Sequence, residues 1–489
     1  MAAARDAYQG LGYHRPLAFG LSAALNMSSN PKSRQSPDHR TTGAWQALDG
    51  RYHLHPFTDH KGLARDRSRI VRRADGVYVY DADGRQLLDA MSGLWCVNAG
   101  YGRHELVDAA RQQLEELPYY NSFFQCTTAP TVELAAELIR VSPPGFSRVF
   151  FAGSGSESID TAIRMVRRYW ELLGQPERTH IVARENAYHG STIAGTSLGG
   201  MGAQRAQGGP LVPDISHVAQ PYWFGTDRSE TPEQMGERLA AELATHIDEV
   251  GVERVAAFFA EPVQGAGGVI IPPATYWPAV QQVCRERDVL LVCDEVITGF
   301  GRLGEWFGCE HFNVRPDLMT FAKGVTSGYL PLGGVLVGDR VASALVDLGG
   351  EFHHGYTYSG HPACAAVALA NLALLERENL IARVATDIGP YLQERWEGLS
   401  RHPLVGETRM VGLMGAAELV ANKDRMTRFD ESDGVGLRCR NLAIENGLVM
   451  RAVGDTMIIA PPFVLSHSEA DELADKAWQT LNALDASLH

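Results

Sequence analysis

The sequence predicts an α/β protein, in which a large domain with a mostly parallel sheet flanked by helices is joined to a smaller α+β domain. Short apolar runs alternate with amphipathic stretches between residues 148 and 324, a pattern typical of parallel strands linked by crossover helices. A chain of 489 residues also exceeds one ordinary domain. Its 45% apolar and 21% charged residues match an average globular chain, so disorder is not the default expectation.

The expected elements follow in order along the chain. A hairpin is predicted in GVYVYDADGRQLLD, where apolar and polar residues alternate around Asp83 and Gly84. A helical run after His361 and Pro362 covers 363–378, and the mixed region beyond it is assigned to the smaller domain. The predicted strands of the large sheet are 148–153, 180–186, 255–262, 289–295 and 318–324, and the predicted helices between them include 156–173 and 275–287.

These elements divide the chain into four segments, which are a flexible N-terminal extension (1–45), the N-terminal part of the small domain (46–90), the large domain (91–365) and the C-terminal small domain (366–489). Residues 17–25 resemble a signal-peptide core only faintly, because the apolar run is short and is interrupted by glycine and serine. We expect a disordered or misannotated leader instead, with Met27 as an alternative start. No apolar stretch approaches the ~20 residues that span a bilayer.

Charge and cysteine content argue against several classes of function. Lys and Arg total 44 against 58 Asp and Glu, and the net charge of −14 argues against broad contact with nucleic acid or an anionic membrane surface. The seven cysteines are scattered and contain no C-x-x-C pair, so neither a disulfide framework nor a thiolate zinc site is expected, and no metal site is predicted. We expect reduced thiols in a cytoplasmic protein.

A turn rich in glycine and serine, residues 153–158, joins a predicted strand to a predicted helix. Its N–H groups and the positive end of the helix dipole favour an anion, so Ser154, Gly155 and Ser156 form a candidate phosphate cradle. The turn nearly fits the dinucleotide pattern G-x-G-x-x-G, but Ser158 replaces the third glycine, and the Gly-Lys-Ser/Thr of a nucleotide P-loop is missing. An ordinary capped helix start is the alternative.

Two charged residues follow buried strands. Asp294 comes after five consecutive apolar residues, at the strand end where open α/β sheets bind ligands. A carboxylate there is costly unless it is paired, and a protonated ring nitrogen would be a suitable partner; a helix cap or a structural ion pair is the alternative. Lys323, one of only five lysines, lies between an apolar strand and a loop of small residues. Burial would favour its nucleophilic neutral form, whereas a snorkelling side chain is the alternative.

A phosphate cradle, a strand-end aspartate and a sequestered lysine, in this chain order, are the parts that pyridoxal 5′-phosphate requires. Eight stretches, three of which contain these parts, make the comparison specific: GLWCVNAGYGR, LPYYNSFF, FAGSGSES, ENAYHGST, AEPVQGAGGV, DEVITGFGRLGEWFG, AKGVTSGYLPLGG and YTYSGHP. Together these stretches resemble the class III, fold-type I aminotransferases from about residue 46 to 485. Within that family the resemblance is to ω-transaminases that use pyruvate with an amine, a diamine or β-alanine.

The resemblance implies a role for each matching residue. Lys323 is implied to be the Schiff-base lysine, and Asp294 the partner of the pyridine nitrogen. Thr357 is implied to reach the phosphate from the other subunit, which implies a homodimer with shared active sites. The other implied cofactor contacts are the phosphate cup at Ser154, Gly155 and Ser156, the stacking ring of Tyr188 with His189 beside it, Val296 on the opposite ring face, and Glu261 as a supporting carboxylate. Core packing for Tyr188 and Val296, and turn chemistry for Thr357, are the alternatives.

The resemblance also implies a substrate pocket. Arg451 matches a mobile arginine that binds the carboxylate of the acceptor by a bidentate pair and swings away when an uncharged amine binds; a surface arginine is the alternative. Trp95 could equally be a core residue, and the resemblance alone favours the pocket. The implied apolar walls are Phe57, Trp95, Phe123, Phe124 and Tyr188.

The implied reaction is a ping-pong transamination, in which Lys323 acts as general base and acid and Asp294 supplies electrostatic stabilisation. Putrescine or a related monoamine is the first donor to test, β-alanine the next, and pyruvate is the acceptor. A class III aminomutase or decarboxylase, a nicotinamide-dependent oxidoreductase and a silent binding protein are the alternatives. The sequence leaves open whether two dimers associate into a tetramer.

Overall fold

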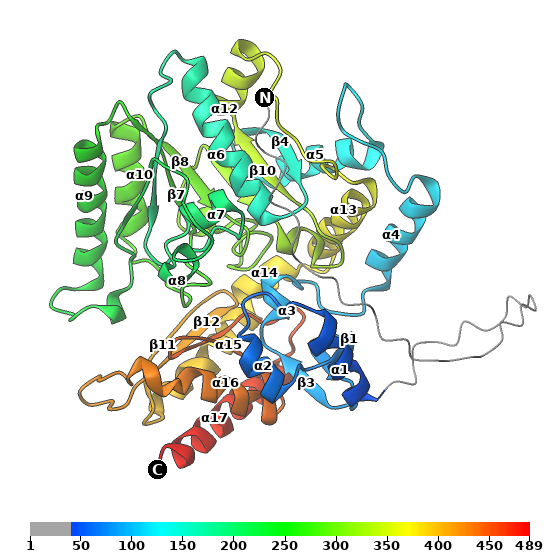
Figure 1. Ribbon diagram of the computed structural model, residues 1–489, viewed down its shortest axis with the longest axis vertical. Helices are drawn as coiled ribbons and strands as arrows, with labels where there is room; N and C mark the ends of the chain where they lie inside the picture. The colour runs from blue at the N-terminus through cyan, green and yellow to red at the C-terminus, as the bar shows by residue number, and fades with distance from the viewer. Residues whose placement is uncertain (1–40) are drawn as a thin grey trace, which may run out of the picture. The chain divides into compact units, whose positions relative to one another are not determined.

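The computed structural model describes residues 41–489, whose contacts divide the chain after Ser68 into an N-terminal unit and a larger unit, Arg69–His489 (Figure 1). Most of the predicted extension, residues 1–40, lies outside the described residues. Residues 42–45, predicted to end that extension, instead form the first turn of α1 (Thr42–Tyr52). The helix begins there because the Thr41 hydroxyl accepts a hydrogen bond from the Ala44 N–H. Helix α2 (His60–Asp66) is capped in the same way by Asp59.

A seven-stranded sheet forms the centre of the larger unit, with the order β4-β10-β9-β8-β7-β5-β6. The pairs β8–β9, β7–β8, β5–β7 and β5–β6 are parallel, whereas β10 is antiparallel to both of its neighbours. The mostly parallel sheet is therefore confirmed. Its strands are β4 (Phe146–Ala152), β5 (His180–Arg184), β6 (Ile215–Val218), β7 (Val255–Ala260), β8 (Leu290–Asp294), β9 (Leu318–Phe321) and β10 (Gly333–Gly338).

All five predicted strands of this sheet are present, but β6 and β10 were not predicted. Strand β10 contains three glycines in six residues, and glycine normally weakens a strand. The glycines are needed because a Cβ at Gly333 would come within 2.7 Å of the Ser154 backbone, and one at Gly334 within 2.6 Å of the Phe321 ring. Strand β6 is a four-residue edge strand that is half-buried throughout, so it lacks an apolar run.

Helices cover both faces of the sheet (Figure 1). They are needed on both because apolar side chains alternate between the two faces along each strand. Phe258 packs into a core shared with α5, α9, α10 and α13, whereas its neighbour Phe259 packs into the core under α6 and α12. The predicted helices over 156–173, 275–287 and 363–378 are confirmed within one residue. The bounds are α5 (Ala129–Val141), α6 (Gly155–Leu172), α9 (Pro232–Val250), α10 (Tyr276–Glu286), α12 (Asp339–Ser343) and α13 (Pro362–Arg377).

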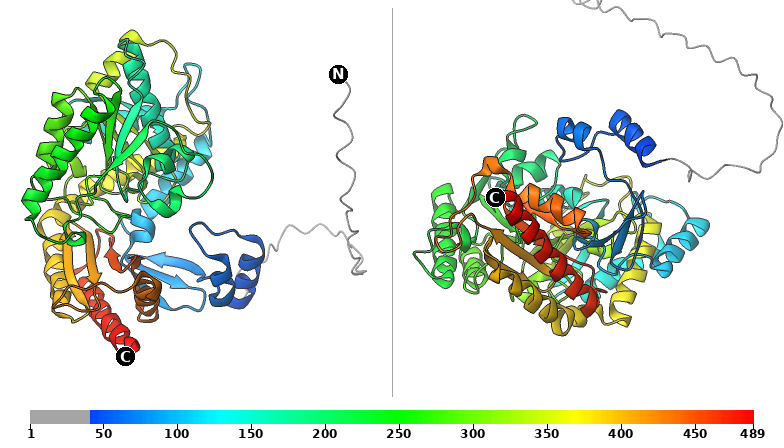
Figure 2. Two further views of the ribbon diagram at one scale, coloured as in Figure 1. Left: turned by 60° about the vertical axis from the view of Figure 1, so that its left-hand side comes forward. Right: turned by 90° about the horizontal axis from the view of Figure 1, so that it is seen from below.

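The larger unit also contains two four-stranded sheets, and the predicted hairpin is the antiparallel pair β2–β3. Strand β3 also pairs in parallel with β13, so residues near each end of this unit share one sheet. Helix α17 packs against α15 and α16 (Figure 2). The strands are β1 (Val71–Asp75), β2 (Tyr78–Asp81), β3 (Gln86–Asp89), β11 (Val405–Val411), β12 (Met414–Leu419), β13 (Leu448–Val449), β14 (Arg451–Val453) and β15 (Thr456–Ile459).

The remaining elements are mostly short connections. All seven cysteines are free thiols. Among residues 41–489, no helix has both the length and the apolar character needed to cross a membrane. The remaining helices are α3 (Ser92–Trp95), α4 (His104–Glu116), α7 (Ile193–Leu198), α8 (Gly202–Arg205), α11 (Gly308–His311), α14 (Leu380–Thr386), α15 (Ile388–Glu397), α16 (Val435–Glu445) and α17 (His467–Leu488), with single turns η1 (Trp223–Gly225), η2 (Lys323–Thr326), η3 (Ala344–Leu348), η4 (Gly398–Arg401) and η5 (Glu431–Asp433).

Candidate active site

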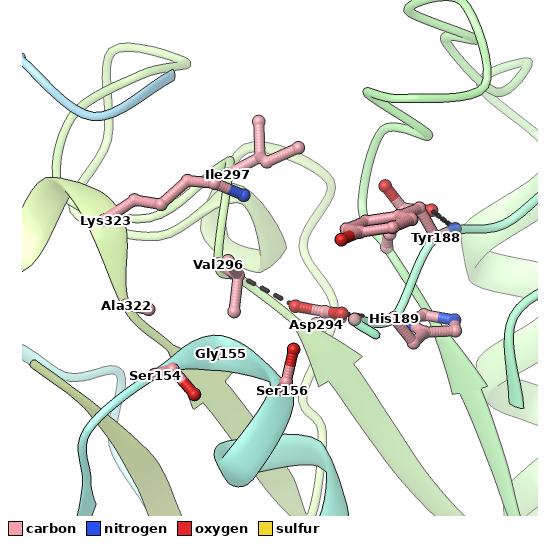
Figure 3. Close-up of a pocket in the computed structure, with 12 residues that line it drawn as sticks. Ser154, Gly155, Ser156, Tyr188, His189, Asp294, Val296, Ile297, Ala322 and Lys323 are labelled. Atoms are coloured by element: carbon pink, nitrogen blue, oxygen red, sulfur yellow. Dashed lines mark hydrogen bonds and ion pairs between the residues drawn. The ribbon is translucent and has the colours of Figure 1, made fainter. Parts of the chain in front are cut away.

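A cavity of about 170 Å³ lies at the carboxyl ends of the parallel strands, where open α/β sheets bind ligands. The predicted phosphate turn, the strand-end aspartate and the lysine all line this one cavity (Figure 3). The structure therefore brings together residues that are separated by up to 169 positions in the chain. The lining residues are Ser154, Gly155, Ser156, Tyr188, His189, Gly190, Glu261, Asp294, Val296, Ile297, Ala322 and Lys323.

Asp294 is the last residue of β8 and is held by three hydrogen bonds. Its Oδ1 accepts from the Thr320 hydroxyl at 3.0 Å and from the Val296 N–H at 3.1 Å, and its Oδ2 lies 2.7 Å from His189 Nδ1. The carboxylate is 5% exposed. These bonds fix its orientation and satisfy part of its hydrogen-bonding capacity, which a buried carboxylate requires.

His189 is buried, and its second ring nitrogen, Nε2, has no hydrogen-bond partner among the described residues. Glu261 follows β7 and is also buried; its carboxylate accepts from the Tyr188 N–H at 3.2 Å and from the Gly265 N–H at 3.0 Å. Burial raises the pKa of Glu261, and the nearby Asp294 charge raises it further. The floor of the cavity therefore holds two carboxyl groups, of which Asp294 makes the hydrogen bond to the buried imidazole.

Lys323 follows β9 after one residue, and its side chain extends across the cavity towards Tyr188 and Asp294 (Figure 3). Burial lowers the pKa of the Lys323 amine and the Arg451 charge also lowers it, whereas Cys96, Asp294 and Glu261 raise it. A larger fraction of this amine is therefore neutral than for an exposed lysine. That is the form in which an amine is a nucleophile or a base.

The backbone holds Lys323 in the left-handed region, at φ 43°. This conformation costs free energy for a residue with a side chain, so the surroundings must stabilise it. Asn371 of α13 does so by donating from its Nδ2 to the carbonyl oxygens of Gly324 and Val325, both at 3.0 Å. A hydrogen bond of 2.7 Å from the Ser327 hydroxyl to Asn371 Oδ1 orients that amide.

Helix α6 begins at the predicted phosphate turn. The Ser154 hydroxyl caps the helix by accepting from the Glu157 N–H at 3.2 Å, which confirms the capped start. Gly155 and Ser156 occupy the first two helical positions, whose N–H groups have no partner within a helix. A Cβ at Gly155 would come within 3.0 Å of the Val296 side chain, so glycine allows the backbone to lie against the cavity wall. A capped start and an anion site are therefore compatible here.

Several lining or supporting residues were not predicted. Thr320 is one, although it lies opposite Asp294 in the register of β8 and β9, so its position follows once the two strands are paired. Gly190, by contrast, belongs to the matched stretch around Tyr188 and His189; it lines the cavity, and a Cβ there would come within 2.5 Å of Ser156 Oγ. Ile297 and Ala322 also line the cavity, and as apolar neighbours of predicted residues they carry no separate signal in the sequence.

The predicted substrate residues are not gathered in the same way. Tyr188 lines the cavity, and Arg451 interacts electrostatically with both Tyr188 and Lys323. Trp95 is 1% exposed and packs in a buried cluster that includes Ile297. Phe123 lines a different cavity, between β4 and the 354–359 loop.

Phe124 is 88% exposed and Phe57, which belongs to the N-terminal unit, is 77% exposed. Thr357 is exposed, and its carbonyl oxygen accepts from the Tyr119 hydroxyl at 2.7 Å. Thr357, Phe57, Phe123 and Phe124 are absent from the residues lining the cavity of the described chain. Their predicted roles remain predictions.

Comparison with known proteins identifies the family. Residues 63–481 match the model of aminotransferase class-III. The putrescine–pyruvate aminotransferase of Pseudomonas aeruginosa is 53% identical over 447 residues, which cover 91% of this chain and 98% of that protein. The vanillin aminotransferase of Capsicum annuum is 41% identical over 86% of this chain and 92% of that protein.

Solved structures agree with this likeness. A thermostable (S)-enantioselective omega-transaminase from Thermomicrobium roseum superposes with a TM-score of 0.89 at 42% identity, covering 91% of this chain and 99% of that chain. The omega-transaminase of Pseudomonas jessenii in complex with PMP gives a TM-score of 0.88 at 37% identity over 90% of this chain and 98% of that chain. The fold predicted from the sequence, that of the fold-type I transferases, is confirmed.

Proposed function

The chain belongs to the class III aminotransferases, and we propose that it transfers an amino group from a primary amine to pyruvate, giving alanine and an aldehyde or ketone. Class III aminotransferases depend on pyridoxal 5′-phosphate. The observation that carries the proposal is the single cavity lined by the Lys323 amine, the Asp294 carboxylate and the start of α6.

The residues of the cavity fit this cofactor. Its phosphate would meet the Gly155 and Ser156 N–H groups at the positive end of an 18-residue helix. Its ring nitrogen would meet Asp294, which is buried and already oriented by His189. Its aldehyde would meet the Lys323 amine, whose pKa burial lowers. A further support is His189 Nε2, which has no hydrogen-bond partner among residues 41–489, so the polar groups of this floor are not all satisfied by the protein itself.

The protein residues divide the work. When bound, pyridoxal phosphate supplies an electron sink for the carbon from which a proton is removed. Lys323 Nζ is the base that removes this proton and the acid that returns one, because its neutral form is favoured in the cavity. Asp294 would hold the ring N–H of the bound cofactor by a charge-assisted hydrogen bond, and His189 and Thr320 keep its carboxylate in place.

Arg451 is the residue that we assign to the carboxylate of pyruvate. It is the first residue of β14, and burial lowers the pKa of its guanidinium. Among residues 41–489 no carboxylate lies within ion-pair distance of it, so its charge is available to a ligand. A keto acid would supply the missing carboxylate in a bidentate pair.

The donor is proposed from the relative whose name states its substrates. Putrescine or a related monoamine comes first because the putrescine–pyruvate aminotransferase is 53% identical over nearly its whole length. β-Alanine comes second. Tyr188 is the only predicted apolar wall that lines the cavity in the described chain. A homodimer with shared active sites would allow the exposed Phe124 and Thr357 to contribute, and it forms part of this proposal.

The test is a donor panel assayed with pyruvate on the purified, cofactor-loaded protein. We expect one alanine per amine consumed, with putrescine among the fastest donors. Amine consumption without alanine would indicate an aminomutase or a decarboxylase. Borohydride reduction followed by peptide mapping should place the pyridoxyl group on Lys323. Label on another residue, or no bound chromophore, would contradict the proposal.

A further inference from the structure

A cluster of three metal-ligating side chains lies in the N-terminal unit. Asp49, His53 and His55 each offer one ligand atom, and these atoms lie within 4.8 Å of one another. His53 Nδ1 is 3.0 Å from Asp49 Oδ1, and His55 Nε2 is 2.8 Å from Asp49 Oδ2. The cluster is built entirely from residues 49–55, and the proposed transamination uses none of them.

The backbone holds the three ligands in place. Asp49 and His53 lie one turn apart on α1, so their side chains share one helix face. His53 ends that helix, and its N–H donates to the Asp49 carbonyl oxygen at 2.9 Å. His55 precedes Pro56, which restricts the His55 backbone to extended conformations, and its ring lies against the Asp49 carboxylate. The two rings then lie 4.1 Å apart between centroids.

We propose that Asp49, His53 and His55 bind a divalent transition-metal ion, with Zn²⁺ as the ion to test first. Two imidazoles and one carboxylate are ligands that Zn²⁺ accepts, and three protein ligands leave one tetrahedral position for water or another small ligand. The set contains nitrogen atoms and a single carboxylate, so the oxygen-seeking Ca²⁺ and Mg²⁺ are disfavoured.

The observed separations are close to those that a metal requires. Ligand atoms roughly 2.0–2.1 Å from Zn²⁺ in a tetrahedral site lie about 3.3 Å from each other. The two measured separations from Asp49, 3.0 and 2.8 Å, are hydrogen-bond distances and need to open by only a few tenths of an ångström. Both imidazoles can turn that far because the His53 and His55 side chains are 59% and 23% exposed.

The space beside the cluster can hold the remaining ligand. Asp49 and His53 line a cavity of about 360 Å³ together with His60, Arg67 and Ser68. Ser68 is 9% exposed, and its hydroxyl has no hydrogen-bond partner among the described residues. A metal-bound water would provide that partner. Arg67 opposes a bare cation, so a water or an anion in the fourth position would also screen the two charges.

The charge of the cluster suits a cation. Both oxygens of the Asp49 carboxylate face an imidazole nitrogen, Oδ1 that of His53 and Oδ2 that of His55, so a cation between them would meet one carboxylate and two imidazoles. A simple hydrogen-bonded cluster is the alternative, and it needs no metal. Substitution of a histidine by an amide distinguishes a zinc site from a purely hydrogen-bonded cluster. An amide side chain can replace the hydrogen bond, but it is a poor ligand for zinc.

The test uses the tag-free, full-length, cofactor-loaded protein, freed of metal with a chelator and titrated with ZnCl₂ in a calorimeter. We expect one zinc per chain, retained through gel filtration and detected by elemental analysis. His53→Asn and His55→Gln keep a hydrogen-bond donor near Asp49 and should each weaken binding by roughly 100-fold or more, since loss of second-shell partners alone costs 10–100-fold. His353→Ala is the matched control, because His353 faces a single carboxylate, that of Glu351, and should leave binding unchanged.

A second measurement reports on the segment itself. Zinc should slow protease cleavage within residues 42–68 of the wild-type protein and not of the two variants, because a bound ligand stabilises the state that binds it. Calcium at the same concentration should do neither. Absence of stoichiometric zinc, or binding that is the same in His53→Asn and His55→Gln as in the wild type, would overturn the proposal.

Discussion

The two halves of the predicted site differ in how the fold holds them. The half assigned to the cofactor is made of Asp294, Lys323 and the start of α6, which are fixed by strand ends, a helix terminus and hydrogen bonds. The half assigned to the substrate is dispersed. Trp95 is buried in the core and Phe124 is 88% exposed, while Arg451 lies on β14, the edge strand of the four-stranded sheet β11-β12-β15-β14.

The difference shows what regular structure can specify. Residues at the carboxyl ends of parallel strands must meet at one edge of the sheet, so their chemistry is assembled by the topology itself. Side chains on loops and on the surface are not constrained in this way, and Phe57, Phe123 and Phe124 do not line the cavity of the described chain. Under the proposed function, substrate choice would therefore depend on parts that the central sheet does not position.

The largest expected effect is on the cofactor half. Lys323→Ala should lower turnover by at least about 10⁴-fold, the upper end of what a positioned acid–base group contributes. Stability should not fall, because the variant removes a desolvated amine that makes no salt bridge among the described residues. Steady-state kinetics and urea unfolding measure the two quantities. Lys476→Ala, which removes a surface ion pair with Glu472, is the control with normal turnover. Substantial activity in Lys323→Ala would remove the basis of the comparison.

Trp95→Ala tests whether this residue belongs to the core or to a pocket wall. Its side chain is 1% exposed, so we expect a loss of about 3–5 kcal/mol in the free energy of unfolding, as for other buried aromatic truncations. The neighbouring Leu94 is 55% exposed, and Leu94→Ala should change stability by no more than about 0.5 kcal/mol. Chemical denaturation measures both. A stable Trp95→Ala with altered amine preference would move Trp95 to the substrate half.

Asp294→Asn keeps the size of the side chain and removes its charge. We expect turnover to fall by about 10²–10³-fold, the usual effect of removing one preorganised electrostatic group. The absorbance spectrum of the bound cofactor should change as well, because the amide no longer favours a protonated ring nitrogen. Asp339→Asn, at the start of α12 and outside the cavity, is the control. Unchanged kinetics would show that the carboxylate only supports the fold.

Arg451→Met addresses the substrate half. We expect KM for pyruvate to rise about 10- to 100-fold, the equivalent of one charged hydrogen-bonded pair worth 1.5–3 kcal/mol. The half-reaction with an uncharged amine should change little, because that donor has no carboxylate for Arg451 to bind. Single-turnover kinetics separate the two half-reactions. An equal loss in both would assign Arg451 to structure.

The smallest expected effect is on the pKa of Lys323, which charged groups from both halves of the site influence. The Asp294 and Glu261 charges raise the pKa of Lys323, whereas burial and the Arg451 charge lower it. Glu261→Gln should therefore lower this pKa and extend the neutral amine to lower pH, while Arg451→Met should raise it. The pH dependence of cofactor capture by the apoprotein measures the direction of each change. An unchanged pKa in Arg451→Met would show that Arg451 lies too far away to act on the amine.

Most of the large sheet could be predicted because apolar runs such as those of β7 and β8 are unambiguous. Strand β10 was missed because its glycines are required by close contacts with Ser154 and Phe321. These contacts are tertiary, so no local sequence pattern reveals them. For the same reason Asp294 and Lys323 could be selected from their positions after buried strands, whereas Thr320 becomes visible only once β8 and β9 are placed in register. The exposed position of Phe124 depends on long-range packing and could not be foreseen.

The left-handed backbone at Lys323 has a wider consequence. The main chain positions the Lys323 amine. Asn371 of α13 restrains that main chain by hydrogen bonds to two of its carbonyl oxygens. Under the proposed function, the position of the Lys323 amine would thus depend on a buried amide that does not line the cavity. Substitutions around the rim of the cavity can then change which amines are accepted. A substitution at Asn371 would instead lower turnover with every substrate.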